Sequence, residues 1–244
     1  MPRNPIAEGQ NKGIKYEQKI NNILKEKNLQ LPSTQSAGAS DAPDGYFWFN
    51  ENRYPIEIKR QNADFAQVEL RWNKTEGFQY SKVSKNPFFI EFLINNTNFL
   101  EIINEKWTEI PRKFTKKDLT KQDREWDLDH FSDIKENIDV SYIEKFYNLK
   151  EPSIYYVQIQ NRGFFYLDQD IAGLNLPRIN GNPYLRARVK TRSSSKNKWG
   201  FLVAIKMPGI KPSTHDIEET DNRKFPIPDG SHIKRDQKSI NEFI

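Results

Sequence analysis

The sequence predicts an α/β (α+β) fold in which a central mixed sheet is flanked by helices and followed by a β-rich C-terminal part. Three observations predict this class. Residues 13–29 carry apolar side chains at helical spacing, residues 45–60 read as two strands joined by a polar turn, and strand-like patterns dominate from residue 152 onward. The chain of 244 residues is long enough for one large domain or two small ones.

The N-terminal segment predicts one helix and one loop. Residues 1–12 read as a flexible lead, and residues 13–29 as an amphipathic helix whose apolar face includes Tyr16, Ile20 and Leu24. Residues 32–44 are rich in Ser, Ala, Gly and Pro, which is typical of a loop.

Three strands are expected next. Residues 45–49 and 54–60 form a predicted hairpin around the turn at 50–53, and Pro55 should mark the start of its second strand because proline breaks a central ladder. Residues 66–72 alternate between apolar and polar side chains and predict a third strand, with a helix as the weaker alternative.

The middle of the chain is more helical. The apolar run FFIEFLIN at 88–95 fits either a buried strand or a buried helix, and residues 99–107 have a helical pattern. Residues 111–151 begin basic and become acidic, with apolar residues spaced through them, and we expect a helical insertion or connector.

The C-terminal part predicts two hairpins and an irregular tail. Residues 154–160 and 164–168 flank the turn Asn161-Arg162-Gly163, and residues 184–192 and 199–206 flank the polar sequence SSSKNK. The tail at 207–244 is charged and rich in proline. We therefore expect a core at 1–110, a connector at 111–151 and a β-rich region at 152–244.

Composition limits the kinds of function. Aromatic residues form 13% of the chain, which argues against disorder, and the net charge of +5 is a mild indication of a polyanionic partner. Cysteine is absent, which excludes disulfides, thiolate metal sites and cysteine nucleophiles, and the 3 histidines are scattered. There is no signal-peptide pattern and no apolar run long enough for a membrane span, so we expect a cytoplasmic protein that does not enter membranes.

Acidic and basic residues converge in the stretch GASDAPDGYFWFNENRYPIEIKR at 38–60. Because side chains alternate along a strand, Glu57 and Lys59 share one face, and Asp44 lies at the mouth of the predicted hairpin. Two carboxylates, with the backbone carbonyl of Ile58, provide the hard oxygen ligands that Mg²⁺ prefers, and Lys59 can orient a water and stabilise developing charge. This chemistry suits phosphodiester hydrolysis.

Pro43-Asp44, 12 intervening residues and Glu57-Ile58-Lys59 resemble the PD-(D/E)xK motif of the restriction-endonuclease-like nuclease superfamily. The resemblance covers residues 13–72 and implies a restriction-endonuclease-like core, one or two Mg²⁺ ions and cleavage that leaves 5′-phosphate and 3′-hydroxyl ends. It further implies catalytic roles for Glu17 on the preceding helix and for Gln67 after the motif.

Simpler interpretations stay open for several of these residues. Asp44 can simply cap a turn, with Glu57 and Lys59 as exposed cross-strand residues on a strand surface. Asp41 is an alternative to Asp44 as the metal ligand. Glu17 borders the apolar helix face, and it is either a solvated glutamate or an accessory metal carboxylate.

A second candidate site is a basic strand. Residues 184–206 hold seven Lys or Arg and no acid, and four of the basic side chains fall on one face of the first strand. Like charges along a strand repel, and a phosphate backbone lying across them would compensate. The expected DNA-contacting residues are Arg186, Arg188, Lys190, Arg192, Ser193, Ser194, Ser195, Lys196 and Lys198. The alternative is an exposed strand whose charges block edge-to-edge aggregation.

The expected function is therefore Mg²⁺-dependent endonucleolytic cleavage of double-stranded DNA. A small chain with its own DNA-contact region most resembles a type II restriction endonuclease, and we expect a bacterial, archaeal or phage origin. A homodimer would let such an enzyme cut both strands. A Holliday-junction resolvase or a repair or recombination nuclease of the same superfamily is the first alternative. A DNA-binding protein without catalysis is the second.

Overall fold

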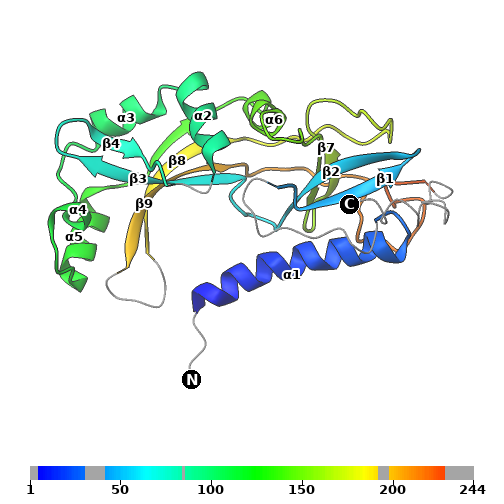
Figure 1. Cartoon of the computed structure of the whole chain (residues 1–244), viewed down its shortest axis with the longest axis horizontal. Coiled ribbons are helices and arrows are strands. Elements are labelled where there is room, and N and C mark those ends of the chain that lie inside the picture. Colours follow the sequence, from blue (N-terminus) through cyan, green and yellow to red (C-terminus); the bar gives the residue numbers. More distant parts are fainter. Residues whose placement is uncertain (1–4, 31–41, 84–85, 192–197, 229–244) are drawn as a thin grey trace, which may run out of the picture. The chain divides into compact units, whose positions relative to one another are not determined.

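The computed structural model describes residues 5–30, 42–83, 86–191 and 198–228 (Figure 1). Over these residues the chain is a mixed α/β protein with two sheets and six helices, which confirms the predicted fold class. The expected strands are divided between the two sheets, and one of the sheets is mixed.

The chain forms two compact units, and each unit draws on separate stretches of sequence. The five-stranded unit comprises Asn62–Leu149 and Gly181–Gly209 together with the helical residues 5–12. The four-stranded unit comprises the described parts of Gly13–Gln61, Lys150–Asn180 and Ile210–Ile244. The units therefore interleave along the chain and do not follow the contiguous segments expected from composition.

The four-stranded unit contains the hairpin that the sequence singled out. Its strands lie in the order β1-β2-β6-β7, and only the β2–β6 pair is parallel. The strands are β1 (Gly45–Phe49), β2 (Asn52–Lys59), β6 (Tyr156–Ile159) and β7 (Gly163–Tyr166). The predicted hairpins β1–β2 and β6–β7 are both confirmed.

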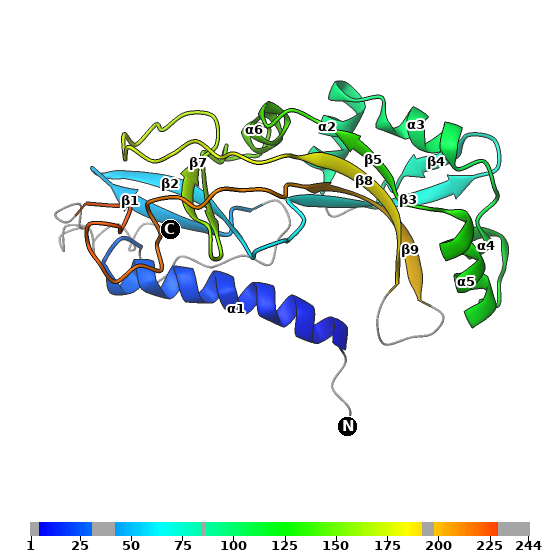
Figure 2. The same ribbon diagram turned by 180° about the vertical axis from the view of Figure 1, so that it is seen from behind.

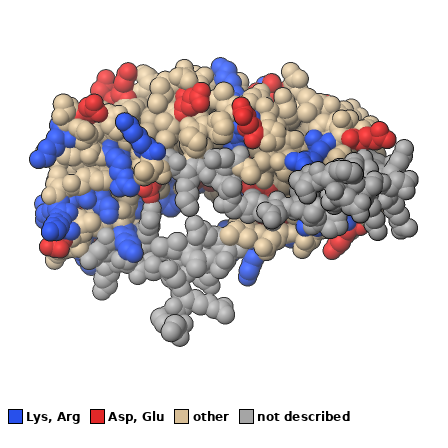
Figure 3. All heavy atoms as spheres, in the orientation of Figure 1, with Lys and Arg blue, Asp and Glu red and all other residues tan. Residues whose placement is uncertain are grey.

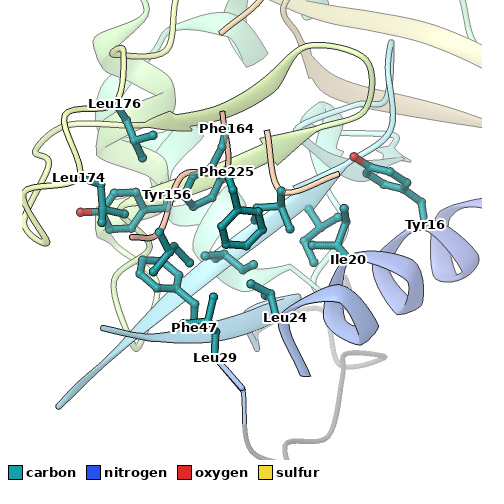
Figure 4. Close-up of a cluster of buried hydrophobic side chains, with 14 residues drawn as sticks. Tyr16, Ile20, Leu24, Leu29, Phe47, Tyr156, Phe164, Leu174, Leu176 and Phe225 are labelled. Atoms are coloured by element: carbon teal, nitrogen blue, oxygen red, sulfur yellow. The ribbon is translucent and has the colours of Figure 1, made fainter. Parts of the chain in front are cut away.

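Helix α1 (Pro5–Glu26) contributes its apolar face to the core of this unit (Figure 4). Tyr16, Ile20 and Leu24 are buried there, as the helical spacing predicts. The helix begins within the expected flexible lead, which is a correction. Pro5 is its first residue, a position where proline is favoured because the missing N–H would have no helical partner.

Aromatic rings fill the rest of this core. Phe47 of β1 contacts Tyr156 of β6 and Phe164 of β7 edge-on, with ring centroids 5.4 and 6.0 Å apart. All three side chains are fully buried (Figure 4). Residues far apart in the sequence thus fix β1 and β2 against β6, and the hairpin rests on a packed layer.

Pro55 lies inside β2, where we expected a strand start. β2 pairs with β1 from Asn52 onward but with β6 only from Ile56 onward. At Pro55 the strand therefore has a neighbour on one side only, and the missing N–H can face the open side.

The five-stranded unit is an antiparallel sheet in the order β4-β3-β9-β8-β5. Its strands are β3 (Ala66–Asn73), β4 (Gly77–Tyr80), β5 (Ile134–Asn137), β8 (Tyr184–Thr191) and β9 (Trp199–Lys206). The predicted strands near 66–72, 184–192 and 199–206 are confirmed over the described residues.

Helices cover one face of this sheet, where α2, α3 and α6 lie on the same side in both views (Figures 1 and 2). The helices of the unit are α2 (Pro87–Asn96), α3 (Phe99–Lys106), α4 (Arg112–Thr115), α5 (Lys121–His130) and α6 (Ser141–Asn148). Phe78, Trp107, Phe131 and Phe201 form its aromatic centre, with ring centroids 5.0 to 5.9 Å apart.

Two ambiguous segments are resolved in this unit. The run FFIEFLIN is helical, and its start is marked by Asn86, whose side chain accepts the Phe89 N–H, and by Pro87 in the first turn. The expected helical connector is interrupted by the short strand β5, which pairs with β8.

No helix in the described part of the chain has the length and apolar character needed to cross a membrane.

Candidate active site

Asp44 and Glu57 meet at the open end of the β1–β2 hairpin. Gly45 pairs with Ile56, so Asp44 lies one position beyond this pair and next to Glu57. The Asp44 Oδ2 accepts a hydrogen bond of 2.9 Å from the Ile58 N–H. The predicted proximity of these two carboxylates is therefore present, and a backbone bond fixes one of them.

Two lysines bind Glu57. The Lys59 ammonium forms an ion pair with Oε1 of Glu57, and the Lys150 Nζ donates to Oε2 at 3.2 Å. The side chains of Glu57 and Lys150 are only 4% and 6% exposed, whereas that of Lys59 is 17% exposed. Buried charges are costly unless they are paired, and here each oxygen of the carboxylate contacts an ammonium group.

The two carboxylates respond oppositely to this environment. Burial, with the nearby charge of Glu57, raises the pKa of Asp44 to about 7. Burial alone would also raise the pKa of Glu57, but the Lys59 and Lys150 charges outweigh it and lower that pKa. At neutral pH Glu57 is ionised, while Asp44 is close to its midpoint.

Glu17 of α1 belongs to the same group of charges. Partial burial raises the pKa of Glu17, the Lys59 charge opposes this effect, and the Glu57 charge adds to it. Glu17 is also among the charges that raise the pKa of Asp44. The structure thus brings Glu17, Asp44, Glu57 and Lys59 into mutual electrostatic range.

Asn21 joins α1 to the start of β1. Its buried Nδ2 donates to the backbone carbonyls of Glu17 and Asp44 at 2.9 and 3.0 Å, and its Oδ1 accepts from Gln30 Nε2 at 2.6 Å. A Cβ on Gly45 would lie 2.5 Å from this Oδ1, so glycine allows the close approach. Asn21 and Gly45 therefore hold the two acid-bearing backbone segments together.

The remaining predicted site residues are not all found in the four-stranded unit with Asp44 and Glu57. Ile58 pairs with Gln158 of β6, and the use of its carbonyl as a ligand stays a prediction. Gln67 lies on β3 in the five-stranded unit and accepts from Lys190 at 3.3 Å, so its catalytic role also stays a prediction. Asp41 lies outside the described residues.

The donor groups of this site suit a hard divalent cation under one condition. Asp44 and Glu57 provide carboxylate oxygens, and a cation would counter both the burial and the negative charge of Glu57 that raise the pKa of Asp44. Both Glu57 oxygens already contact lysines, so a metal ligand role requires an ammonium group to move. Within the described residues, no group of three or more histidine or acidic side chains is arranged to hold a metal ion.

The basic strand β8 has its charges partly compensated by partners distant in sequence. Arg186 forms an ion pair with Asp133, and its Nε lies 2.8 Å from an Asp133 oxygen. Arg188 lies 3.5 Å from Asp64, which also contacts the Lys206 Nζ at 2.7 Å. Arg186 and Arg188 therefore have acidic partners in the fold, and their contact with DNA stays a prediction.

The remaining proposed contact residues follow β8 in the sequence. Lys198 is described and exposed. The predicted contacts Arg192, Ser193, Ser194, Ser195 and Lys196 lie outside the described residues.

Basic side chains also gather around α4 and α5 on the face shown in Figure 3. Arg112 stacks over Trp126 with its guanidinium 4.5 Å from the ring centroid, and Lys113 Nζ lies 5.0 Å from the Trp199 centroid. Asp123 contacts both Arg112 and Lys116, at 3.6 and 2.5 Å. At this basic end of the five-stranded unit, Arg112 and Lys113 thus pack against aromatic rings, and Asp123 compensates part of the positive charge.

Comparisons with known proteins give one remote structural likeness. No protein-family model and no curated protein matches the chain. The structure is similar to that described as "HhaI endonuclease in Complex with DNA", with a TM-score of 0.39 and 15% sequence identity over 81% of this chain and 88% of that chain. Because this likeness is so remote, we base the function on the residues of this chain.

Two functional candidates escaped sequence reasoning. Lys150 carries no local signal, since it follows Glu57 by 93 residues and stands in no motif. Asn21 lies on the same helix as Glu17, but its buried contacts depend on how α1 packs against the hairpin. The only available hint was a polar residue one position from the apolar face.

Proposed function

We propose that the chain is a metal-dependent nuclease whose active site is formed by Asp44, Glu57 and Lys59. One observation carries this proposal. Two carboxylates lie side by side at the end of a hairpin, and burial together with the charge of Glu57 raises the pKa of Asp44 to about 7. A fold gains nothing from such crowding, whereas a site for a divalent cation does.

The residues divide the chemistry between them. Asp44 and Glu57 would hold Mg²⁺, which when bound supplies Lewis-acid neutralisation of the phosphoryl oxygens and activation of a water. Lys59, the more exposed of the two lysines at the site, would donate to the attacking water or to a phosphoryl oxygen and stabilise developing negative charge. Glu17 would orient a water through its partly buried carboxyl group.

DNA is the proposed substrate. The polar face of β8 supports this choice, because Lys190 adds positive charge to a strand whose arginines form ion pairs with acids, and the exposed Lys198 directly precedes the neighbouring strand β9. Contacts of this kind bind a phosphate backbone without reading sequence. Cleavage by a sequence-specific type II restriction endonuclease, as a homodimer on double-stranded DNA, is the finer form of the proposal.

A panel of DNA substrates tests the proposed activity. Linear duplex, single-stranded and four-way-junction DNA are incubated with the protein, with Mg²⁺ or with chelator, and the ends are sequenced. We expect Mg²⁺-dependent cuts that leave 5′-phosphates, and loss of cutting in Asp44→Ala and Lys59→Ala.

The substrate preference separates the alternatives. Cuts at one short sequence in linear duplex favour restriction, and cuts confined to junctions favour a resolvase. Binding without cleavage of any substrate, unchanged by both substitutions, would leave a non-catalytic DNA-binding protein and overturn the metal-site proposal.

A further inference from the structure

Lys150 is a buried lysine at the proposed active site that belongs to no recognised pattern in the sequence. Its Nζ lies 3.2 Å from Glu57 Oε2, and the Lys59 ammonium forms an ion pair with Oε1 of the same carboxylate. It is the first residue of the stretch that returns the chain to the four-stranded unit. The fold thus delivers a second ammonium group to the same carboxylate.

The two lysines differ in their access to solvent. The Lys59 side chain is 17% exposed and that of Lys150 is 6% exposed. Lys59 is therefore better placed to meet a substrate that arrives from solution. Lys150 is held against Glu57 in the interior, where an ammonium group needs a carboxylate partner.

A metal ion at Glu57 would compete with Lys150 for the same oxygen. An ammonium group and a divalent cation are both attracted by the carboxylate, and they repel each other at short range. Each of the two cations therefore weakens the interaction of the other with Glu57 Oε2.

We infer that Lys150 is an internal counter-ion, which occupies Glu57 Oε2 in the metal-free protein and leaves this oxygen when a divalent cation binds. This inference rests on the proposed metal site and assigns Lys150 a positioning role within it. In the metal-free state Lys150 keeps Glu57 in place, and its departure makes that oxygen available as a ligand.

Lys150→Met tests the inference because methionine keeps much of the apolar stem and removes the charge. Two quantities are measured in the full-length protein: the Tm in the presence of chelator, and the Kd for Mn²⁺ by titration calorimetry. We expect the Tm to fall, because Glu57 loses a partner, and Mn²⁺ to bind about tenfold more tightly, because its competitor is gone.

A fall in the Tm together with a rise in the Mn²⁺ affinity distinguishes an internal counter-ion from other roles. A lysine that only supports the fold would lower both the Tm and the metal affinity, and a lysine that only contacts substrate would leave the metal affinity unchanged. Either result would overturn the inference. Lys150→Arg keeps the charge and should keep the Mn²⁺ affinity near that of the unsubstituted protein.

Two further variants complete the test. Lys15→Met removes an exposed lysine of α1 and should change neither quantity. If Lys150→Met does not fold, Lys150→Gln retains a hydrogen-bond donor for Glu57, and its Mn²⁺ affinity is expected to rise in the same way. Absence of Mn²⁺ binding by the unsubstituted protein would contradict the proposed function itself. Unchanged or weaker binding by the variant alone would contradict only the role of Lys150.

Discussion

Asp44→Asn should make the metal-free protein more stable at alkaline pH. Burial and the charge of Glu57 raise the pKa of Asp44 from 3.8 to about 7. An acid with a raised pKa binds its proton more tightly in the folded than in the unfolded state. The free energy of unfolding therefore falls as the pH rises from about 4 to about 7 and stays low above that range.

The size of the effect follows from the shift. The rise in the pKa from 3.8 to about 7 corresponds to at most about 4 kcal/mol. Asp44 is only partly buried, so solvent screening lowers this value, and we expect roughly 2 kcal/mol. Asparagine lacks the charge and keeps an oxygen that can accept the Ile58 N–H.

Urea unfolding of both proteins at pH 4, 6 and 8, in the presence of chelator, measures this difference. The variant should be nearly as stable as the unsubstituted protein at pH 4 and more stable by roughly 2 kcal/mol at pH 8. Mg²⁺ should then stabilise the unsubstituted protein at pH 8 more than the variant. Asp129→Asn, at an exposed position of α5, is the matched control and should behave like the unsubstituted protein. Equal stability of Asp44→Asn and the unsubstituted protein at every pH would refute the raised pKa of Asp44 on which the proposed metal site rests.

Two further substitutions test the support of the site and the proposed DNA surface. Gly45→Ala places a Cβ 2.5 Å from Asn21 Oδ1, and it should cost about 1–3 kcal/mol of stability and remove the stabilisation by Mg²⁺. Gly200→Ala is its control, because a Cβ there meets nothing within 4 Å. Equal unfolding midpoints of the two variants in urea would contradict the close packing of Gly45 against Asn21. Lys190→Ala should weaken DNA binding to all sequences alike and reduce the slope of log affinity against log salt concentration by about 1, as measured by fluorescence anisotropy. An unchanged slope would show that this strand does not contact the phosphate backbone.

Local patterns were sufficient to predict the hairpin and the position of its acids. The alternation along 54–60 and the polar turn before it define β2, and antiparallel pairing then brings Asp44 beside Glu57. The helical nature of 88–95 was also present in the sequence. Asn86 and Pro87 form a typical helix start, but the nearly unbroken apolar run hides the helical period.

Contacts that close over long sequence separations could not be predicted in the same way. Lys150 reaches Glu57 across 93 residues, and Asp64 and Asp133 compensate arginines of β8 that are more than 50 residues away in sequence. A lysine or aspartate in a connecting segment shows no period, and its partner is set by the fold alone. The start of α1 escaped prediction because residues 5–12 show too few apolar side chains to reveal a period.

The most direct test of the proposed nuclease site is single-turnover cleavage by Glu57→Gln. Glutamine keeps the size of the side chain and removes the charge that pairs with Lys59 and would hold the metal. On the DNA substrate that the unsubstituted protein cuts in Mg²⁺, we expect cleavage to fall by about 100-fold or more while DNA affinity is retained. Cleavage at the original rate by a folded Glu57→Gln protein would contradict the assignment of this hairpin as the active site.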